Sequence, residues 1–147
     1  MGRIIGGILA GIVSAFAAIW LIEFVGHSVY PVRSDVNQGN VEEMASLIRG
    51  MPVGAQAFVV LAWLVGAMAG GVVANSIANR RWPAWPVAAL VAAASILNIL
   101  MIPHPEWMQI GAVVAPVLGG LLATHLAKGA PSGPATTSTG AANAEQI

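Results

Sequence analysis

The sequence contains no cysteine and very little charge. Without cysteine the chain cannot form a disulfide, a thiolate metal site or a cysteine nucleophile. Only 8% of the residues are charged, and six basic residues balance six acidic ones. Globular proteins carry about 25% charged residues, so this composition leaves too little polar surface to cover a soluble domain. The scattered basic residues also give no electrostatic footprint for nucleic acid, which we do not expect as a partner.

Long apolar segments are what the sequence has in abundance. Hydrophobic residues make up 57% of the chain, and the mean hydropathy is +0.79. Four segments reach the roughly 20 residues that cross a hydrocarbon core of about 30 Å as a helix. They cover about 4–26, 52–78, 83–102 and 105–127. We predict an all-α integral membrane four-helix bundle of two antiparallel helical hairpins, with the lipid bilayer as its surroundings.

The chain divides into a four-span transmembrane domain, 1–128, and a tail, 129–147. The tail consists largely of Ala, Gly, Ser, Thr and Pro. Such a composition cannot bury a core, so we expect a disordered cytoplasmic tail. The first segment has the A-x-A-like "AFA" of a signal peptide at 15–17, but its apolar run continues to Val25. Because that run exceeds a typical signal-peptide core, we expect an uncleaved first span.

The basic residues predict the orientation, because cytoplasmic loops are enriched in Lys and Arg. One side receives Arg3, Arg80, Arg81 and Lys128, and the other receives Arg33 and Arg49 with Asp35, Glu42, Glu43 and Glu106. This distribution predicts a multi-pass plasma-membrane protein with both termini in the cytoplasm. Trp82 and Trp85 then mark the inner interface, and Trp107 and Tyr30 the outer one.

The outer loop, 28–51, contains the pattern of a short helix. Asn40 and Glu43 have capping-box spacing, with Asn in place of Ser or Thr. Met44, Leu47 and Ile48 fall on one side, and the sequence Gly-Met-Pro at 50–52 ends the segment. We expect a connector that rests its apolar side on the bundle; a lid or an interfacial anchor is the alternative.

Small residues recur at four-residue spacing in the predicted spans. In a bilayer, close packing of such residues holds helices together, because lipid is as apolar as leucine. The stripes include Gly7, Gly11, Gly66, Gly70 and Gly119. We assign them to packing within the chain, while the same stripes can also join copies into a homo-oligomer.

Two further features of the spans are a weak repeat and an internal proline. At a constant offset of 53, Pro52, Gln56, Val60, Ala62 and Gly66 match Pro105, Gln109, Val113, Ala115 and Gly119. Because so few residue types make up these spans, the matches are weak evidence of a duplication. Pro116, inside the fourth span, has no N–H and therefore frees the carbonyl of Ala112.

Ionisable residues gather near the outer ends of the first and third spans. Glu23 lies about 13 Å from the middle of its span, near the edge of the hydrocarbon. His27 follows at i+4, so the two share a helix face and can pair. The third span should end beside them. We therefore expect five candidate ligand- or ion-binding residues to converge on an outer vestibule: Glu23, His27, Asn98, His104 and Glu106.

Three interpretations of this cluster remain open. In the structural one, the Glu23 carboxylate accepts a hydrogen bond from Asn98 or His27 and locks the helices together. In the second, Glu23 and His27 form a proton- or cation-responsive site of a channel or transporter. In the third, His27 and His104 contribute with the carboxylates to a divalent metal site such as zinc, although no ligand spacing supports it. No cofactor is expected.

Several short stretches resemble a known group of proteins. They are the E-x-x-G-H of Glu23, Gly26 and His27, the W-x-x-G-A of Trp63, Gly66 and Ala67, and "NILMIPHPEW" at 98–107. Over about 2–127 the chain resembles small four-span integral membrane proteins of bacteria, a family of unknown function. The resemblance implies a four-span fold and no activity.

Catalytic motifs are missing from the sequence. Neither G-x-S-x-G nor H-E-x-x-H occurs, and no serine has a histidine and a carboxylate at a recognisable spacing. We therefore predict a non-enzymatic helix-packing or accessory membrane component. The rival prediction is an oligomeric proton or cation channel or transporter that uses Glu23 and His27.

Overall fold

The computed structural model describes residues 1–31, 40–102 and 104–127. These residues form five helices: α1 (Gly2–Val29), α2 (Val41–Gly50), α3 (Val53–Ala78), α4 (Ala84–Met101) and α5 (Glu106–Leu126). All but α2 are long and apolar enough to cross a membrane, so the predicted all-α bundle with four candidate spans is confirmed. The predicted tail, 129–147, lies outside the described residues.

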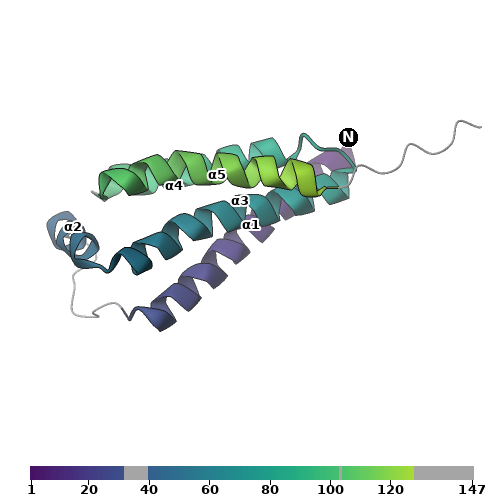
Figure 1. Cartoon of the computed structure of the whole chain (residues 1–147). Helices are drawn as coiled ribbons and strands as arrows, with labels where there is room; N and C mark the ends of the chain where they lie inside the picture. Colours follow the sequence, from purple (N-terminus) through teal and green to yellow (C-terminus); the bar gives the residue numbers. More distant parts are fainter. Residues whose placement is uncertain (32–39, 103, 128–147) are drawn as a thin grey trace, which may run out of the picture.

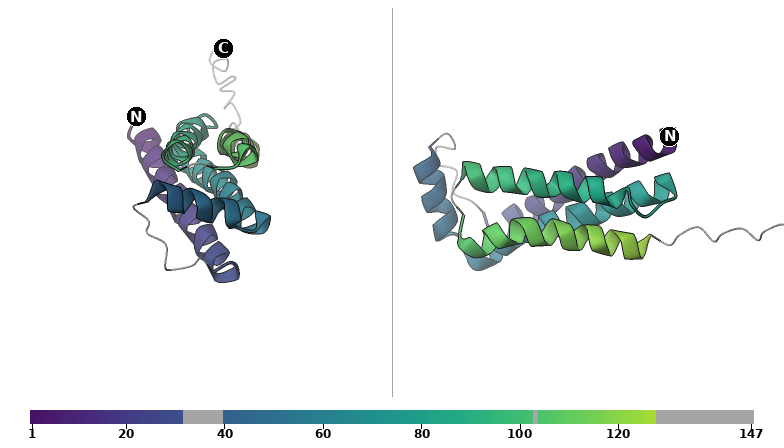
Figure 2. Two further views of the ribbon diagram at one scale, coloured as in Figure 1. Left: turned by 90° about the vertical axis from the view of Figure 1, so that its left-hand side faces the viewer. Right: turned by 90° about the horizontal axis from the view of Figure 1, so that it is seen from above.

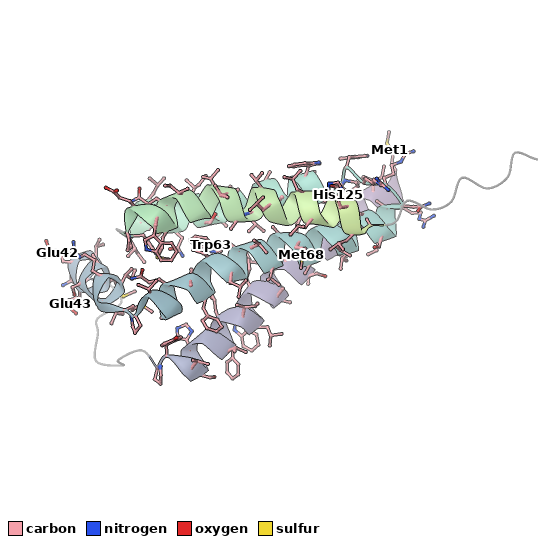
Figure 3. The ribbon with its side chains drawn as sticks, in the orientation of Figure 1. Met1, Glu42, Glu43, Trp63, Met68 and His125 are labelled. Carbon is pink, nitrogen blue, oxygen red and sulfur yellow. The ribbon has the colours of Figure 1, made fainter. Side chains whose placement is uncertain are left out.

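The four long helices form two antiparallel pairs with α3 at the centre (Figure 1). α1 packs mainly on α3, whereas α3 also contacts α4 and α5, which pack on each other. The short helix α2 lies across one end of the bundle (Figure 2). Glu42 and Glu43 mark this end, and Met1 and His125 lie at the opposite end (Figure 3). We call them the α2 end and the N-terminal end.

Small side chains fill the core and large apolar side chains cover the surface, which is the reverse of a soluble protein. The core consists mostly of alanine, and Ala15, Ala62 and Ala67 are fully buried. Large apolar side chains lie outside instead, where Val13 is 69% exposed and Trp20 is 67% exposed. In water such a surface would aggregate, whereas lipid accommodates it without cost. The distribution therefore agrees with a bundle embedded in a bilayer.

Glycines lie where the helices cross. A Cβ atom added to Gly7 would lie 2.8 Å from the backbone oxygen of Ala74, and one added to Gly11 would lie 2.6 Å from that of Gly70. Neither of these positions on α1 has room for a methyl group against α3. The structure thus places the small-residue stripes at contacts within the chain. The two other glycines singled out by their spacing also lie in such contacts, Gly66 against α1 and Gly119 against α3.

Buried Asn75 organises the N-terminal end. Its side-chain oxygen accepts a hydrogen bond from the N–H of Ala84 at 2.8 Å, which satisfies the first turn of α4. Its amide group donates to the carbonyl oxygen of Ala123 on α5, at 3.4 Å. Asn79 ends α3 in the left-handed conformation, with φ of 53°. One side chain therefore joins α3 to both helices of the second pair.

The carbonyl freed by Pro116 finds its partner on the neighbouring helix. α5 continues through Pro116 as one helix. The hydroxyl of Ser95 on α4 donates to the Ala112 carbonyl oxygen at 2.7 Å, in a fully buried setting. The same hydroxyl lies 2.9 Å from the carbonyl oxygen of Ala92 in its own helix. Ser95 therefore supplies the donor that the proline lacks.

The predicted helix of the outer loop is present as α2. The Asn40 side-chain oxygen accepts from the backbone N–H of Glu42 at 3.0 Å and of Glu43 at 3.4 Å. The Asn40 amide also donates to the Glu43 carboxylate at 3.1 Å. The apolar side of α2 faces the bundle, as expected, and Ile48 on that side is buried. α2 is thus a capped helix attached through its apolar face.

Candidate functional site

A cavity of about 300 Å³ opens at the α2 end, between the ends of the four long helices and the apolar face of α2. All five helices or their flanks line it, so the fold and not one motif creates it. Its lining comprises Glu23, Gly26, His27, Tyr30, Met44, Leu47, Ile48, Met51, Ala55, Gln56, Phe58, Val59, Asn98, Ile102, His104 and Met108. Most of these side chains are apolar, and a few polar groups lie among them, which is the usual composition of a small-molecule site.

Four of the five residues expected to converge line this cavity. Glu23 and His27 come from the last turns of α1, Asn98 from the last turn of α4, and His104 from the α4–α5 connection. They meet because α1 and α4 run in the same direction, as the order of spans predicted. Glu106 is exposed in the first turn of α5 and does not line the cavity.

The expected pairing of the Glu23 carboxylate is not formed. Glu23 is half-buried, and within the described residues its carboxylate takes part in no hydrogen bond or ion pair. His27 instead lies with Nδ1 2.7 Å from the backbone carbonyl oxygen of Glu23. The i+4 spacing is also that of the backbone hydrogen bond in a helix. The His27 ring can therefore reach the backbone carbonyl of Glu23 as readily as it can reach the Glu23 carboxylate. Asn98 does not bind the carboxylate either, so the structural lock was wrong.

The histidine contacts fix which ring nitrogen carries a proton. A carbonyl oxygen only accepts, so Nδ1 of His27 must be the donor to Glu23. The same holds for His104, whose Nδ1 lies 2.5 Å from the carbonyl oxygen of Ile102. In a neutral ring Nε2 is then an acceptor. When neutral, both imidazoles of the cavity therefore offer an acceptor nitrogen.

A metal centre is not assembled from these residues. Among the described residues there is no group of three His, Cys, Asp or Glu side chains close enough to share a metal ion. Structural and catalytic zinc sites use at least three protein ligands. His27 and His104 line the same cavity, but the carboxylate of Glu106 does not accompany them. The arrangement therefore gives the metal interpretation no support.

Gln56 is a site residue that sequence reasoning did not select. Its amide group donates to the carbonyl oxygens of Ile48 at 2.8 Å and Met51 at 3.4 Å, and so attaches α2 to α3. Its own oxygen accepts from no group in the described part of the chain. A buried glutamine four residues after the proline that starts a span was a usable signal. Gln109 at the matching position donates to the carbonyl of His104 at 3.0 Å.

Two aromatic rings form part of the cavity wall. Tyr30 and Phe58 meet edge to face, with ring centroids 6.1 Å apart. Glycines make room for both rings. A Cβ atom on Gly26 would lie 3.2 Å from that of Phe58, and one on Gly54 would collide with the Tyr30 hydroxyl. No periodicity in the sequence relates these residues, since the contacts join the end of α1 to the start of α3.

The site therefore combines a carboxylate that forms no hydrogen bond with the described residues, several acceptor atoms and an apolar wall, all beneath a short helix at one end of the bundle. A scan against protein-family models, a search of curated proteins and a search of solved structures each gave no match.

Proposed function

We propose that this chain is a non-enzymatic accessory component of the plasma membrane, a multi-pass bundle that presents the α2 end to the exterior. Four candidate spans support the membrane assignment. The assignment to a non-conducting role rests on one observation, the use made of the buried polar side chains.

The buried polar side chains of the described residues are Gln56, Asn75 and Ser95, and each is bonded to backbone groups. They lie at the α2 end, the N-terminal end and the α4–α5 contact. The core cluster of buried residues consists of alanine and valine with Trp63. A proton or cation needs a chain of water or polar groups to cross a membrane. The part of the interior formed by the described residues supports packing and offers no such chain.

The alternative is an oligomeric proton or cation conductor that uses Glu23 and His27. One observation favours it: the Glu23 carboxylate forms no hydrogen bond with any described residue and lines an open cavity with His27 beside it. Intramembrane acids in such settings are often functional. Conduction would require a pore shared between copies. The glycine stripes that could form a homo-oligomer are, however, occupied by contacts within the chain.

Proton flux separates the two functions. The purified chain is reconstituted into vesicles that contain a pH-sensitive dye, with protein-free vesicles and the Glu23→Gln variant in parallel. Our proposal expects the same decay of an imposed pH gradient in all three. Faster decay with the wild-type protein that Glu23→Gln abolishes would establish the conductor. The mass of the protein in detergent then shows whether the conducting species is an oligomer.

The orientation is tested by single cysteines, because the chain has none of its own. Glu42 at the α2 end and Arg80 near the N-terminal end are both exposed. With both termini in the cytoplasm, Glu42→Cys reacts with a membrane-impermeant maleimide in intact cells, and Arg80→Cys reacts only after permeabilisation. The reverse pattern would invert the topology.

A further inference from the structure

We propose that the cavity at the α2 end binds a small amphipathic amine. The ligand class is a protonated ammonium group on a compact apolar body, with the Glu23 carboxylate as its counter-charge. This inference goes beyond the proposed function, which assigns the cavity no ligand, and it does not depend on whether the chain conducts.

The hydrogen-bonding groups of the cavity are mainly acceptors. The Glu23 carboxylate, the Gln56 side-chain oxygen and the Nε2 atoms of His27 and His104 bind no donor in the described part of the chain. Tyr30 and Asn98 supply the donors that remain. A ligand that brings donors satisfies this set, and an ammonium group brings three N–H groups. An anion would instead meet the negative charge of the Glu23 carboxylate.

The charge of the cavity also favours an ammonium ligand. Glu23 is half-buried, and among the described residues no Lys or Arg lines the cavity. A carboxylate removed from water is costly to keep ionised unless a cation or several donors approach it. A bound ammonium forms a charge-assisted hydrogen bond with the carboxylate, which is about twice as strong as a neutral one. Glu23 is the one acid that the described residues contribute to the cavity wall, which matches a ligand with a single positive charge.

The remaining wall fits an apolar body. Phe58 and Tyr30 offer aromatic faces, which attract cations and apolar groups alike. Met44, Met51 and Met108 line other sides, and methionine adapts its shape to irregular ligands. A volume of about 300 Å³ lies at the small end of the range for ligand sites. The cavity therefore suits one ring or a short alkyl chain.

An ammonium group can reach this cavity from two sources. A free amphipathic amine would enter from the exterior or the outer leaflet, whereas a phosphatidylethanolamine would insert its headgroup from the leaflet itself. The recognition chemistry is the same in both cases. Competition between the two in one assay identifies the source.

The assay is calorimetric titration of the full chain in uncharged maltoside micelles, with protein-free micelles as the blank. The probe is phenylbutylammonium; phenylbutanol and phenylbutyrate are its neutral and anionic counterparts. We expect saturable binding of the amine at one site per chain and at least about tenfold weaker binding of the alcohol, from loss of the charge-assisted bond. Displacement by dihexanoyl phosphatidylethanolamine, and not by dihexanoyl phosphatidylglycerol, would identify the lipid headgroup as the source.

Glu23→Gln is the decisive variant, because it removes the charge and leaves the backbone carbonyl that holds His27 intact. We expect it to weaken binding of the amine about tenfold and to leave the alcohol unchanged. Glu106→Gln is the matched control, an acid at the same end that does not line the cavity, and it should bind as the wild type does. If Glu23→Gln fails to fold, Leu47→Trp, which fills the cavity from α2, should abolish binding. Equal affinity for amine and alcohol, tighter binding of the anion, or wild-type affinity in either cavity variant would overturn the assignment.

Discussion

Removal of the Ser95 hydroxyl should destabilise the bundle only while Pro116 is present. The hydroxyl donates at 2.7 Å to the Ala112 carbonyl, which receives no N–H from residue 116. Ser95→Ala leaves that carbonyl without a donor in a fully buried position. Hydrogen bonds between membrane helices average about 0.6 kcal/mol and reach about 1.7, and an unsatisfied buried group costs about 1–3 kcal/mol. We expect a loss of about 1–2 kcal/mol in the free energy of unfolding.

Pro116→Ala supplies the missing donor, because alanine at 116 restores the backbone N–H to the Ala112 oxygen. The variant also loses the volume of a buried ring. A double-mutant cycle cancels that loss and isolates the coupling between the two positions. In the Pro116→Ala background, Ser95→Ala should therefore cost close to nothing. The expected coupling is therefore about 1–2 kcal/mol, within the range seen for groups that share a hydrogen-bond network.

The assay is reversible unfolding in mixed micelles of increasing dodecyl sulfate, followed by tryptophan fluorescence and circular dichroism. Ser76→Ala is the matched control: its hydroxyl donates to Val72 within an unbroken helix turn, at 2.7 Å and in an exposed position. It should change stability little and show no coupling to Pro116. If Ser95→Ala costs the same with and without the proline, the hydroxyl does not serve the orphaned carbonyl and the reasoning is refuted.

Three further predictions concern the packing and the attachment of α2. Gly7→Ala places a methyl group 2.8 Å from the Ala74 oxygen and should cost about 1–3 kcal/mol of overpacking in the same unfolding assay, whereas Gly6→Ala, with nothing within 4 Å, should be neutral. Asn75→Ala leaves the Ala84 N–H unsatisfied and should lower stability by about 1 kcal/mol, whereas Ser76→Ala, at the exposed neighbouring position, should cost little; equal losses would contradict the capping role. Gln56→Leu removes the hydrogen bonds that attach α2 to α3 and should speed hydrogen exchange of the α2 amides selectively. Gln109→Leu is the control and should leave that exchange unchanged. Unchanged exchange in Gln56→Leu would show that apolar contacts alone hold α2.

Sequence patterns were sufficient for the architecture because they report on the environment of whole segments. Continuous apolar runs bounded by Pro52, Pro83 and Pro105 fixed the spans, since proline costs little at a helix start. The spacing of Asn40 and Glu43 predicted α2. Successive spans alternate in direction, and this alternation correctly predicted that Glu23 and Asn98 lie at the same end of the bundle.

The detailed bonding at the site could not be predicted, because it depends on which of several nearby acceptors a side chain reaches. His27 had both the carboxylate and the backbone carbonyl of Glu23 within one turn, and the structure shows that the ring bonds to the carbonyl. Spacing likewise gave no sign that Glu106, two residues after His104, would turn away from the cavity. The role of Gln56 depends on the backbone path of the loop, which no periodicity encodes.

The core of alanine and glycine also determines how stiffness is distributed along the molecule. Alanine and glycine have no side-chain torsions to freeze, so packing them costs no side-chain entropy. Where they meet, at the crossing of α1 with α3, backbone lies directly against backbone and little is left to rearrange. The α2 end is lined instead by methionine and leucine, which retain many rotamers. The helix crossings are therefore the stiff part of the bundle and the α2 end is the adaptable part. Shape changes on binding should be confined to the α2 end.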